Sequence, residues 1–144
     1  MRIAILSDIH DQVWHVEKAL AEMKDAEMLL GCGDYCSPFV VAQLAAAFSG
    51  LIHLVEGNND GDLYRITQVA GQYDHLTFHG EFYEGEEDGC QLALTHYPAL
   101  ARPLALHHAA PVGGAVGIGD PPLALLLAGH PLALVAVAAR GDER

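Results

Sequence analysis

Residues 2–10 read RIAILSDIH, and this stretch sets the pattern for the first half of the chain. Its apolar part, Arg2 to Leu6, predicts a buried strand that ends at a polar turn containing Asp8 and His10. Beyond the turn, apolar residues recur at the spacing of one helix face, at Val13, Val16, Leu20 and Met23. A strand, a polar loop and a helix are therefore expected in this order.

The same strand, loop and helix unit returns twice. Residues 26–32 form a second apolar run that ends at Gly33-Asp34, and Pro38 opens a helical segment that continues to Ser49, because proline is tolerated in a first helical turn. Residues 51–55 form a third run, and a shorter helical face follows it. Strands that read as continuous apolar runs and alternate with helices predict a parallel sheet covered on both faces.

The pattern changes after about residue 74. Residues 75–78, 81–84 and 90–95 are expected to be strands, with turn chemistry at residues 86–89, so antiparallel pairing is predicted in this region. From Leu104 onward Ala, Leu, Gly, Pro and Val dominate, and prolines keep every regular element short. We therefore expect one domain over residues 1–144, with the motifs in 1–103 and a compositionally biased tail in 104–144.

Length and charge exclude several classes of function. The chain has 144 residues, the size of one globular domain, and 19 acidic against 7 basic residues give a net charge of −12. Such a charge opposes nucleic-acid coating or binding to an anionic membrane, so neither is expected as the main partner.

The sequence also favours a cytoplasmic protein. No apolar run is long enough to span a bilayer, and residues 1–7 lack the features of an export signal, so a cytoplasmic location is the default expectation. Cys32, Cys36 and Cys90 are odd in number, and the first two lack the second pair of a zinc site. They are interpreted as reduced packing residues.

Polar side chains follow four of the predicted strands at the point where each strand ends. They are Asp8, His10, Asp34, Asn58 and His96. Taken one at a time, the aspartates could be helix caps, Asn58 a turn residue and the histidines ordinary loop residues. Their shared placement instead favours one pocket, because ligands bind at the carboxyl edge of an open α/β sheet. Carboxylate, imidazole and amide donors suit Mn, Fe, Co, Ni or Zn better than Ca, and Asp34 could bridge two ions.

In its motifs the chain resembles the calcineurin-like metallophosphoesterases, and among them the small prokaryotic phosphodiesterases. The matching motifs are Ser7-Asp8-Ile9-His10, Gly33-Asp34, Gly57-Asn58-Asn59-Asp60 and Thr95-His96, in the family's order and at similar intervals. The resemblance covers residues 1 to about 103. It implies an α/β fold with four layers, α/β/β/α, in which two sheets pack face to face and the C-terminal part is atypical or incomplete.

The resemblance also implies a role for each strand-end residue. Asp8 and His10 would bind a first metal ion, Asp34 would bridge two ions, and Asn58 and His96 would bind the second. Asn58 would in addition contact the phosphate. A hydroxide that bridges the two divalent ions, Mn by preference and Ni, Fe, Co or Zn as alternatives, would attack phosphorus.

Two positions depart from the family pattern. Larger members carry a proton-donating histidine after the motif asparagine, and here that residue is Asn59. The family usually ends its site with Gly-His-x-His, and the candidate here, Gly129 to Leu132, supplies His130 but has leucine in place of the last histidine. His130 is therefore a candidate metal ligand, while His107 and His108 are weaker substitutes.

The function expected from these motifs is a divalent-metal-dependent phosphoesterase, more narrowly a phosphodiesterase that acts on a small phosphate ester. One alternative is a catalytically weakened metal-binding protein or scaffold on the same fold, for which the family's retromer subunit is a precedent. A phosphotransfer domain that forms an aspartyl phosphate is a third reading, but it needs an aspartate where this chain has His10. A homodimer is expected if the second sheet leaves an open edge.

Overall fold

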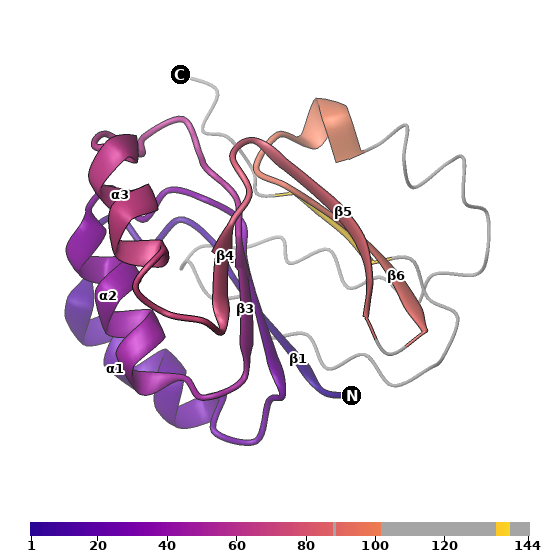
Figure 1. The fold of residues 1–144 in the computed structure, drawn as a ribbon, viewed down its shortest axis with the longest axis horizontal. Helices are drawn as coiled ribbons and strands as arrows, with labels where there is room; N and C mark the ends of the chain where they lie inside the picture. The colour runs from indigo at the N-terminus through magenta and orange to yellow at the C-terminus, as the bar shows by residue number, and fades with distance from the viewer. Residues whose placement is uncertain (88, 102–134, 139–144) are drawn as a thin grey trace.

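The structure is a computed structural model that describes residues 1–87, 89–101 and 135–138. Four parallel strands form a first sheet in the order β1-β2-β3-β4. The strands are β1 (Ile3–Leu6), β2 (Met28–Gly31), β3 (Leu51–Leu54) and β4 (Leu76–Phe78). The helices that connect them are α1 (Val13–Glu22), α2 (Pro38–Ala47) and α3 (Leu63–Ala70). Each strand is added beside the previous one, so right-handed crossovers place all three helices on one face of the sheet (Figure 1).

A second sheet covers the other face. It has the order β5-β6-β7, with β5 (Phe82–Glu87) antiparallel to β6 (Cys90–Thr95) and β7 (Val135–Ala138) parallel to β6. The helices, the first sheet and the second sheet thus form three successive layers (Figure 1). After β6 the chain begins a helical turn at residues 98–101, and the described part of the chain contains no other piece of the fourth layer.

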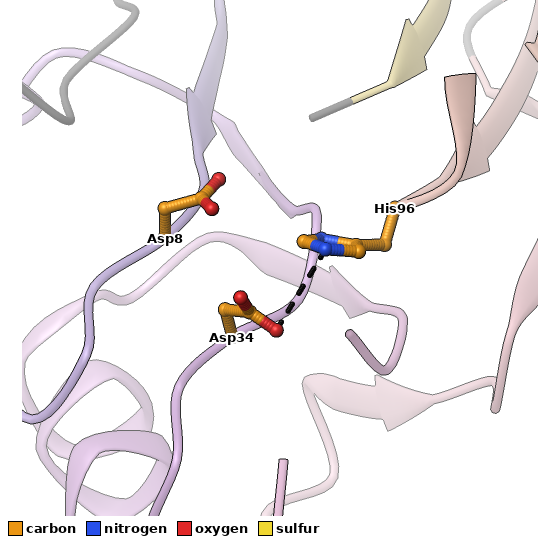
Figure 2. Close-up of side chains that lie close together, drawn as sticks. All are labelled: Asp8, Asp34 and His96. Atoms are coloured by element: carbon orange, nitrogen blue, oxygen red, sulfur yellow. Dashed lines mark ion pairs between the residues drawn. The ribbon is translucent and has the colours of Figure 1, made fainter. Parts of the chain in front are cut away.

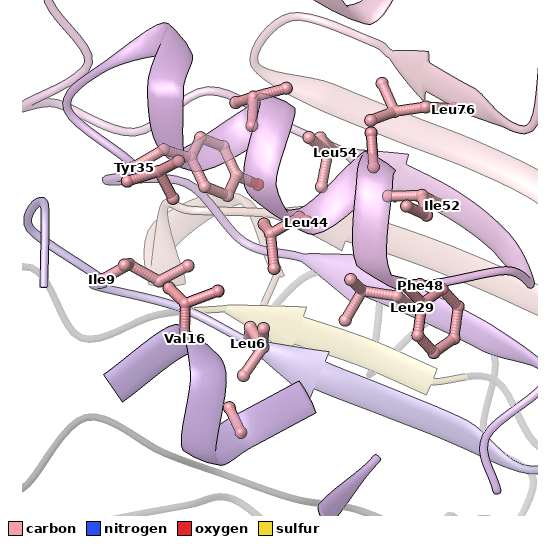
Figure 3. Packing of buried hydrophobic residues seen from close by; sticks show 14 of the residues in the cluster. Leu6, Ile9, Val16, Leu29, Tyr35, Leu44, Phe48, Ile52, Leu54 and Leu76 are labelled. Atoms are coloured by element: carbon pink, nitrogen blue, oxygen red, sulfur yellow. The ribbon is translucent and has the colours of Figure 1, made fainter. Parts of the chain in front are cut away.

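The first sheet is buried on both faces, and this explains its continuous apolar runs. Successive side chains of a strand point to opposite faces. In β2, Leu29 joins the core beneath the helices, whereas Met28 and Leu30 join the core between the two sheets, and all three are fully buried. Figure 3 shows the helix side of this core, where Leu44 of α2 packs against the sheet. The predicted parallel sheet covered on both faces is therefore confirmed.

The helices begin where local sequence favours a start. Pro38 occupies the first turn of α2, where its missing N–H costs no hydrogen bond. The side chain of Asp62 accepts a hydrogen bond from the backbone N–H of Arg65 and so caps α3. No helix among the described residues is long and apolar enough to cross a membrane.

One pairing prediction is wrong. Residues 75–78 do contain a strand, but β4 pairs parallel with β3 instead of antiparallel with a neighbour in sequence. The reason is that α3 carries the chain back along the sheet before β4 begins, which makes a further crossover unit in place of a hairpin. Antiparallel pairing is confirmed for β5 and β6.

A stack of three rings lies where β3 faces the second sheet. The ring of His53 lies 4.6 Å from that of Tyr83 at an interplanar angle of 7°, and the ring of His79 lies 4.0 Å from Tyr83. His53 Nδ1 and His79 Nε2 are 2.9 Å apart and share one hydrogen bond. Burial lowers the pKa of both histidines, and the neighbouring His53 lowers the pKa of His79 further, to about 4.

This stack predicts that the protein loses stability in mild acid. The unfolded chain binds a proton at His79 near pH 6.5, whereas the folded protein does so only near pH 4, so the free energy of unfolding should fall as the pH drops between these values. His79→Gln should remove about 1 kcal/mol of this pH dependence, after allowance for solvent screening at a half-buried ring. Urea unfolding at pH 7 and pH 4.5 measures the difference. His15→Gln, at an exposed position of α1, is the control. If the free energy of unfolding changes equally between pH 7 and pH 4.5 in both variants, the prediction is contradicted.

Candidate metal centre

Four chain segments bring polar side chains together at one edge of the first sheet. Asp8, Asp34 and Asn58 lie in the loops that follow β1, β2 and β3, and His96 follows β6 of the second sheet. Figure 2 shows the side chains of Asp8, Asp34 and His96 directed toward one another. One ligand atom from each of these three residues lies within 4.8 Å of the other two. Because three neighbouring parallel strands end at the same edge, their loops meet there.

Asp34 lies at the centre of the cluster, with 2% of its surface exposed. Its Oδ1 lies 3.7 Å from His96 Nε2, and its Oδ2 lies 3.6 Å from His10 Nε2. Asn59 supplies two hydrogen bonds, from its backbone N–H to Oδ1 (2.9 Å) and from its side-chain amide to Oδ2 (2.7 Å). The two carboxylate oxygens therefore face two different histidines.

His10 lies between the two aspartates at the exposed side of the site. Its Nε2 is 3.7 Å from Asp8 Oδ1, in addition to its contact with Asp34. Its other nitrogen, Nδ1, lies 3.6 Å from the Sγ atom of Cys36. Asp8 in turn accepts a hydrogen bond from the hydroxyl of Ser7. One imidazole nitrogen is thus directed at the carboxylates and the other at a thiol.

His96 is 1% exposed, and both of its ring nitrogens have polar neighbours. Nδ1 lies 2.7 Å from the carbonyl oxygen of Cys32, which can only accept, so Nδ1 donates this hydrogen bond. Nε2 lies 2.8 Å from the side-chain oxygen of Asn58 and 3.7 Å from Asp34 Oδ1. An imidazole nitrogen and two oxygens of this kind, held close together, are donor atoms that one divalent cation can share.

The loops that hold these ligands have unusual backbone geometry. Five described residues other than glycine have positive φ angles, all in the segments after β1 and β2: Asp8 (56°), His10 (46°), Asp11 (58°), Asp34 (60°) and Cys36 (67°). Each such conformation costs of order 1–3 kcal/mol, and such strain is typical of functional sites. Hydrogen bonds from the backbone N–H of Asp8 to Gly33 O (3.1 Å) and of His10 to Asp34 O (2.9 Å) hold the two loops together.

Two glycines allow the loops after β2 and β3 to approach closely. A β-carbon on Gly57 would lie 2.2 Å from Asp34 Oδ1 and 2.5 Å from the Asp34 backbone nitrogen. A β-carbon on Gly33 would lie 2.6 Å from the backbone nitrogen of Gly57, and the φ of Gly33 is +90°. Both positions therefore require glycine, because the obstructing atoms are backbone or the central carboxylate.

Gly57→Ala is expected to displace Asp34 and to weaken binding of divalent cations by roughly 10- to 100-fold. The clash should also cost about 1–3 kcal/mol of stability, which is typical of overpacking. Calorimetric titration with Mn²⁺ and thermal unfolding measure the two effects. Gly71→Ala at the end of α3 is the control, since a β-carbon there meets nothing closer than 3.5 Å. Equal Mn²⁺ affinity in the two variants would show that the Asp34 loop tolerates the added methyl group.

The surroundings of the cluster are negatively charged. The pKa of the Cys36 thiol is raised to about 11, mainly by burial and in addition by the negative charges of Asp11, Asp60, Asp34 and Asp8. Within the described residues, the ion-pair partners of Asp8 and Asp34 are histidines, with no Lys or Arg among them. Two neighbouring carboxylates with imidazoles but no Lys or Arg beside them fit a divalent cation.

The structure thus brings together the side chains of Asp8, His10, Asp34, Asn58 and His96, as the sequence predicted. The helix-cap alternative for the aspartates is wrong, because Gln12 and Ser37 occupy the cap positions of α1 and α2. The reading of His96 as an ordinary loop histidine fails too, since the side chain is buried. His130 lies outside the described residues, as do Leu132, His107 and His108, so their roles stay predictions.

One of the cysteine interpretations needs correction. Cys32 is buried and packs in the core between the sheets, as expected. Cys36 is only partly buried and contacts His10 instead of the core, because the left-handed turn after Asp34 places it at the site. The side chain of Cys90 lies outside the described part of the structure, so its interpretation as a packing residue stays a prediction.

Sequence reasoning missed the roles of Asn59 and Asp60. Asn59 stands at the family's proton-donor position but here donates hydrogen bonds to Asp34. Asp60 accepts hydrogen bonds from three backbone N–H groups around the site. The available signal was the position of Asp60 three residues after Gly57, because aspartate in a turn often bonds nearby backbone N–H groups.

Comparisons with known proteins agree with this geometry. Residues 1–130 match the model of the calcineurin-like phosphoesterase superfamily domain. Phosphodiesterase MJ0936 of Methanocaldococcus jannaschii is 29% identical over 98 residues, which make up 67% of this chain and 58% of that protein. The chain thus spans less than two thirds of the length of this curated relative.

Two solved structures are similar to the fold described here. A novel archaeal phosphodiesterase matches with a TM-score of 0.67 and 26% identity, over 76% of this chain and 67% of that one. Yfce, a phosphoesterase from E. coli, matches with a TM-score of 0.51 and 21% identity, over 69% of this chain and 59% of that one. The second match concerns the fold alone.

Proposed function

Because the chain belongs to the calcineurin-like phosphoesterase superfamily, we propose that it is a metal-dependent phosphoesterase, and more narrowly a phosphodiesterase. The observation that carries this proposal is the cluster of Asp8, Asp34 and His96, whose ligand atoms lie within 4.8 Å of one another. The similarity to archaeal phosphodiesterases supports the narrower assignment to diesters.

The two oxygens of Asp34 support its assignment as a bridging ligand. Oδ2 faces His10, which also contacts Asp8, and Oδ1 faces His96, which also contacts Asn58. We assign Asp8 and His10 to one ion, Asn58 and His96 to a second ion, and Asp34 to both. Mn²⁺ is the proposed metal, and Ni, Fe, Co and Zn suit the same mixture of donors.

When bound, such a pair of ions would lower the pKa of a shared water and neutralise phosphoryl oxygens. The chain's own residues hold this arrangement in place. The carbonyl oxygen of Cys32 holds the ring of His96 through Nδ1, so that Nε2 is directed at Asn58 and Asp34. The side chain of Asn58 is exposed, and we assign to its amide N–H₂ group a hydrogen bond to a phosphoryl oxygen of the substrate.

The leaving group receives no proton from Asn59. A side-chain amide is not an acid at neutral pH, and that of Asn59 already donates to Asp34. Substrates whose leaving group departs without protonation are therefore the appropriate probes. Bis-p-nitrophenyl phosphate is such a phosphodiester, because p-nitrophenolate is a stable anion.

Hydrolysis of this diester tests the proposal. The full chain, freed of metal by a chelator, is expected to regain hydrolysis when Mn²⁺ is added and to lose it again with excess chelator. The monoester p-nitrophenyl phosphate, assayed in parallel, distinguishes a diesterase from a monoesterase. Hydrolysis that is indifferent to the chelator, or none with any of the five metals, would refute the proposal.

A catalytically weakened metal-binding protein or scaffold is the second candidate. It is favoured by Leu132 in place of the family's last histidine and by Asn59 in place of the proton donor. Calorimetry with Mn²⁺ separates the two candidates. Tight binding of two ions per chain supports the enzyme, whereas one weak site or none supports the scaffold.

A further inference from the structure

Asp60 joins the two loops that carry the central ligands. Its Oδ2 accepts hydrogen bonds from the backbone N–H groups of Gly57 (2.7 Å) and Asp34 (3.1 Å). Its Oδ1 accepts a hydrogen bond from the backbone N–H of Cys36 (2.8 Å). Gly57 belongs to the loop after β3, whereas Asp34 and Cys36 belong to the loop after β2. One half-buried carboxylate therefore connects loops that are about 25 residues apart in the chain.

These hydrogen bonds act where the backbone is strained. Asp34 and Cys36 have φ angles of 60° and 67°, which is costly for residues other than glycine. Hydrogen bonds to a charged carboxylate are about twice as strong as those between neutral groups, so Asp60 can offset this cost. Without Asp60, three backbone N–H groups at the site would lose their acceptor.

Asp60 is connected to two of the assigned metal ligands. Its hydrogen bond from the Asp34 N–H fixes the backbone that carries the central carboxylate. Its hydrogen bond from the Cys36 N–H fixes a residue whose Sγ lies 3.6 Å from His10 Nδ1. We propose that Asp60 is a positioning residue that sets the metal affinity of the site by holding Asp34 and His10, an inference that rests on the proposed function.

The negative charge of Asp60 offers a competing explanation, because it would attract a cation from any nearby position. Two substitutions separate geometry from charge. Asp60→Asn keeps the size but removes the charge, and it places an N–H₂ group against at least one backbone N–H. Asp60→Glu keeps the charge, but its extra methylene group moves the carboxylate away from the three N–H groups.

The experiment is calorimetric titration of the metal-free full chain with Mn²⁺. Both variants are expected to bind Mn²⁺ roughly 10- to 100-fold more weakly than the wild type, as is typical when a residue that orients a ligand is lost. Asp62→Asn is the matched control. It makes the same charge change two residues away, where Asp62 caps α3 through the N–H of Arg65, and its affinity should stay within about twofold of the wild type.

Two further measurements show that any loss arises at the site. Thermal unfolding shows whether each metal-free variant is folded. If one Asp60 variant does not fold, Asp60→Ser, whose hydroxyl retains one hydrogen-bond acceptor, is tested in its place. Hydrogen exchange of the Asp34 and Cys36 amides in the metal-free protein should be faster in Asp60→Asn than in Asp62→Asn. This part of the test does not depend on metal binding.

The outcomes distinguish this inference from the proposed function. Wild-type affinity in both Asp60 variants would overturn the positioning role and leave the proposed function intact. Weak binding in Asp60→Asn together with wild-type affinity in Asp60→Glu would also overturn it, because charge alone would then explain the effect. If the wild type does not bind Mn²⁺ but the Asp34 and Cys36 amides exchange faster in Asp60→Asn, the proposed function is contradicted. The hydrogen bonds of Asp60 are confirmed by the same result.

Discussion

Asp34→Asn is expected to lower the rate of Mn²⁺-dependent phosphodiester hydrolysis at least about 100-fold. The substitution keeps the shape of the side chain but removes the negative charge that we assign as a ligand of both ions. The two ions contribute several kcal/mol to catalysis, and each 1.4 kcal/mol corresponds to a tenfold change in rate. It also places an amide N–H₂ group beside Asn59, which donates to both oxygens of Asp34 in the wild type. Initial rates with bis-p-nitrophenyl phosphate at saturating Mn²⁺ measure the loss.

The stability of the same variant separates chemistry from folding. Removal of the buried charge favours the metal-free variant, because Asp34 has no Lys or Arg partner among the described residues, whereas the new amide loses a hydrogen bond from Asn59. These effects oppose each other, so the metal-free variant should stay folded, with a free energy of unfolding within about 2 kcal/mol of the wild type. Asp62→Asn, an exposed position with the same charge change, should keep full activity. Full activity in Asp34→Asn would rule out the bridging role.

Leu94→Ala is expected to destabilise the protein by about 2–5 kcal/mol, which is a large part of the stability of an ordinary domain. Leu94 is fully buried in β6, in the core between the two sheets, and its removal leaves a cavity that the surrounding strands cannot fill. His96 follows two residues later, so the variant should also bind Mn²⁺ more weakly. Urea unfolding of the metal-free protein measures the loss of stability.

Leu51→Ala is the matched control for this experiment, because Leu51 at the start of β3 is 46% exposed. The same truncation there should cost well under half of the Leu94 value, since less apolar surface returns to water and no closed cavity forms. Similar losses in the two variants would contradict the face-to-face packing of the sheets.

The first sheet could be predicted closely, because its strands are buried on both faces. A strand such as β2, with Leu29 toward the helices and Leu30 toward the second sheet, must be apolar at every position, and such runs are visible in sequence. The partner of β4 could not be predicted in this way. Pairing depends on where α3 returns the chain, and the pattern of residues 75–78 is the same for either neighbour.

The ligand cluster was predictable for a related reason. The carboxyl ends of three neighbouring parallel strands meet at one edge, so Asp8, Asp34 and Asn58 had to lie near one another once the sheet was parallel. His96 reaches them only because the second sheet packs on the first, which was expected from the family resemblance and not from periodicity. The place of His130 stays a prediction.

The supporting residues could not be predicted, because their roles depend on backbone geometry. The left-handed turn at Asp34 and Cys36 is invisible in a residue pattern, and it turns Cys36 from a packing residue into a neighbour of His10. Asp60 has the same chemistry as a metal ligand, and only the positions of three N–H groups show that it binds backbone instead.

A crystal structure of the Mn²⁺-loaded protein, with anomalous diffraction to locate manganese, tests the central claim most directly. We expect two manganese positions that share Asp34, one in contact with Asp8 and His10 and the other with Asn58 and His96. Manganese that avoids Asp34, or its absence from the cluster at saturating Mn²⁺, would contradict the account.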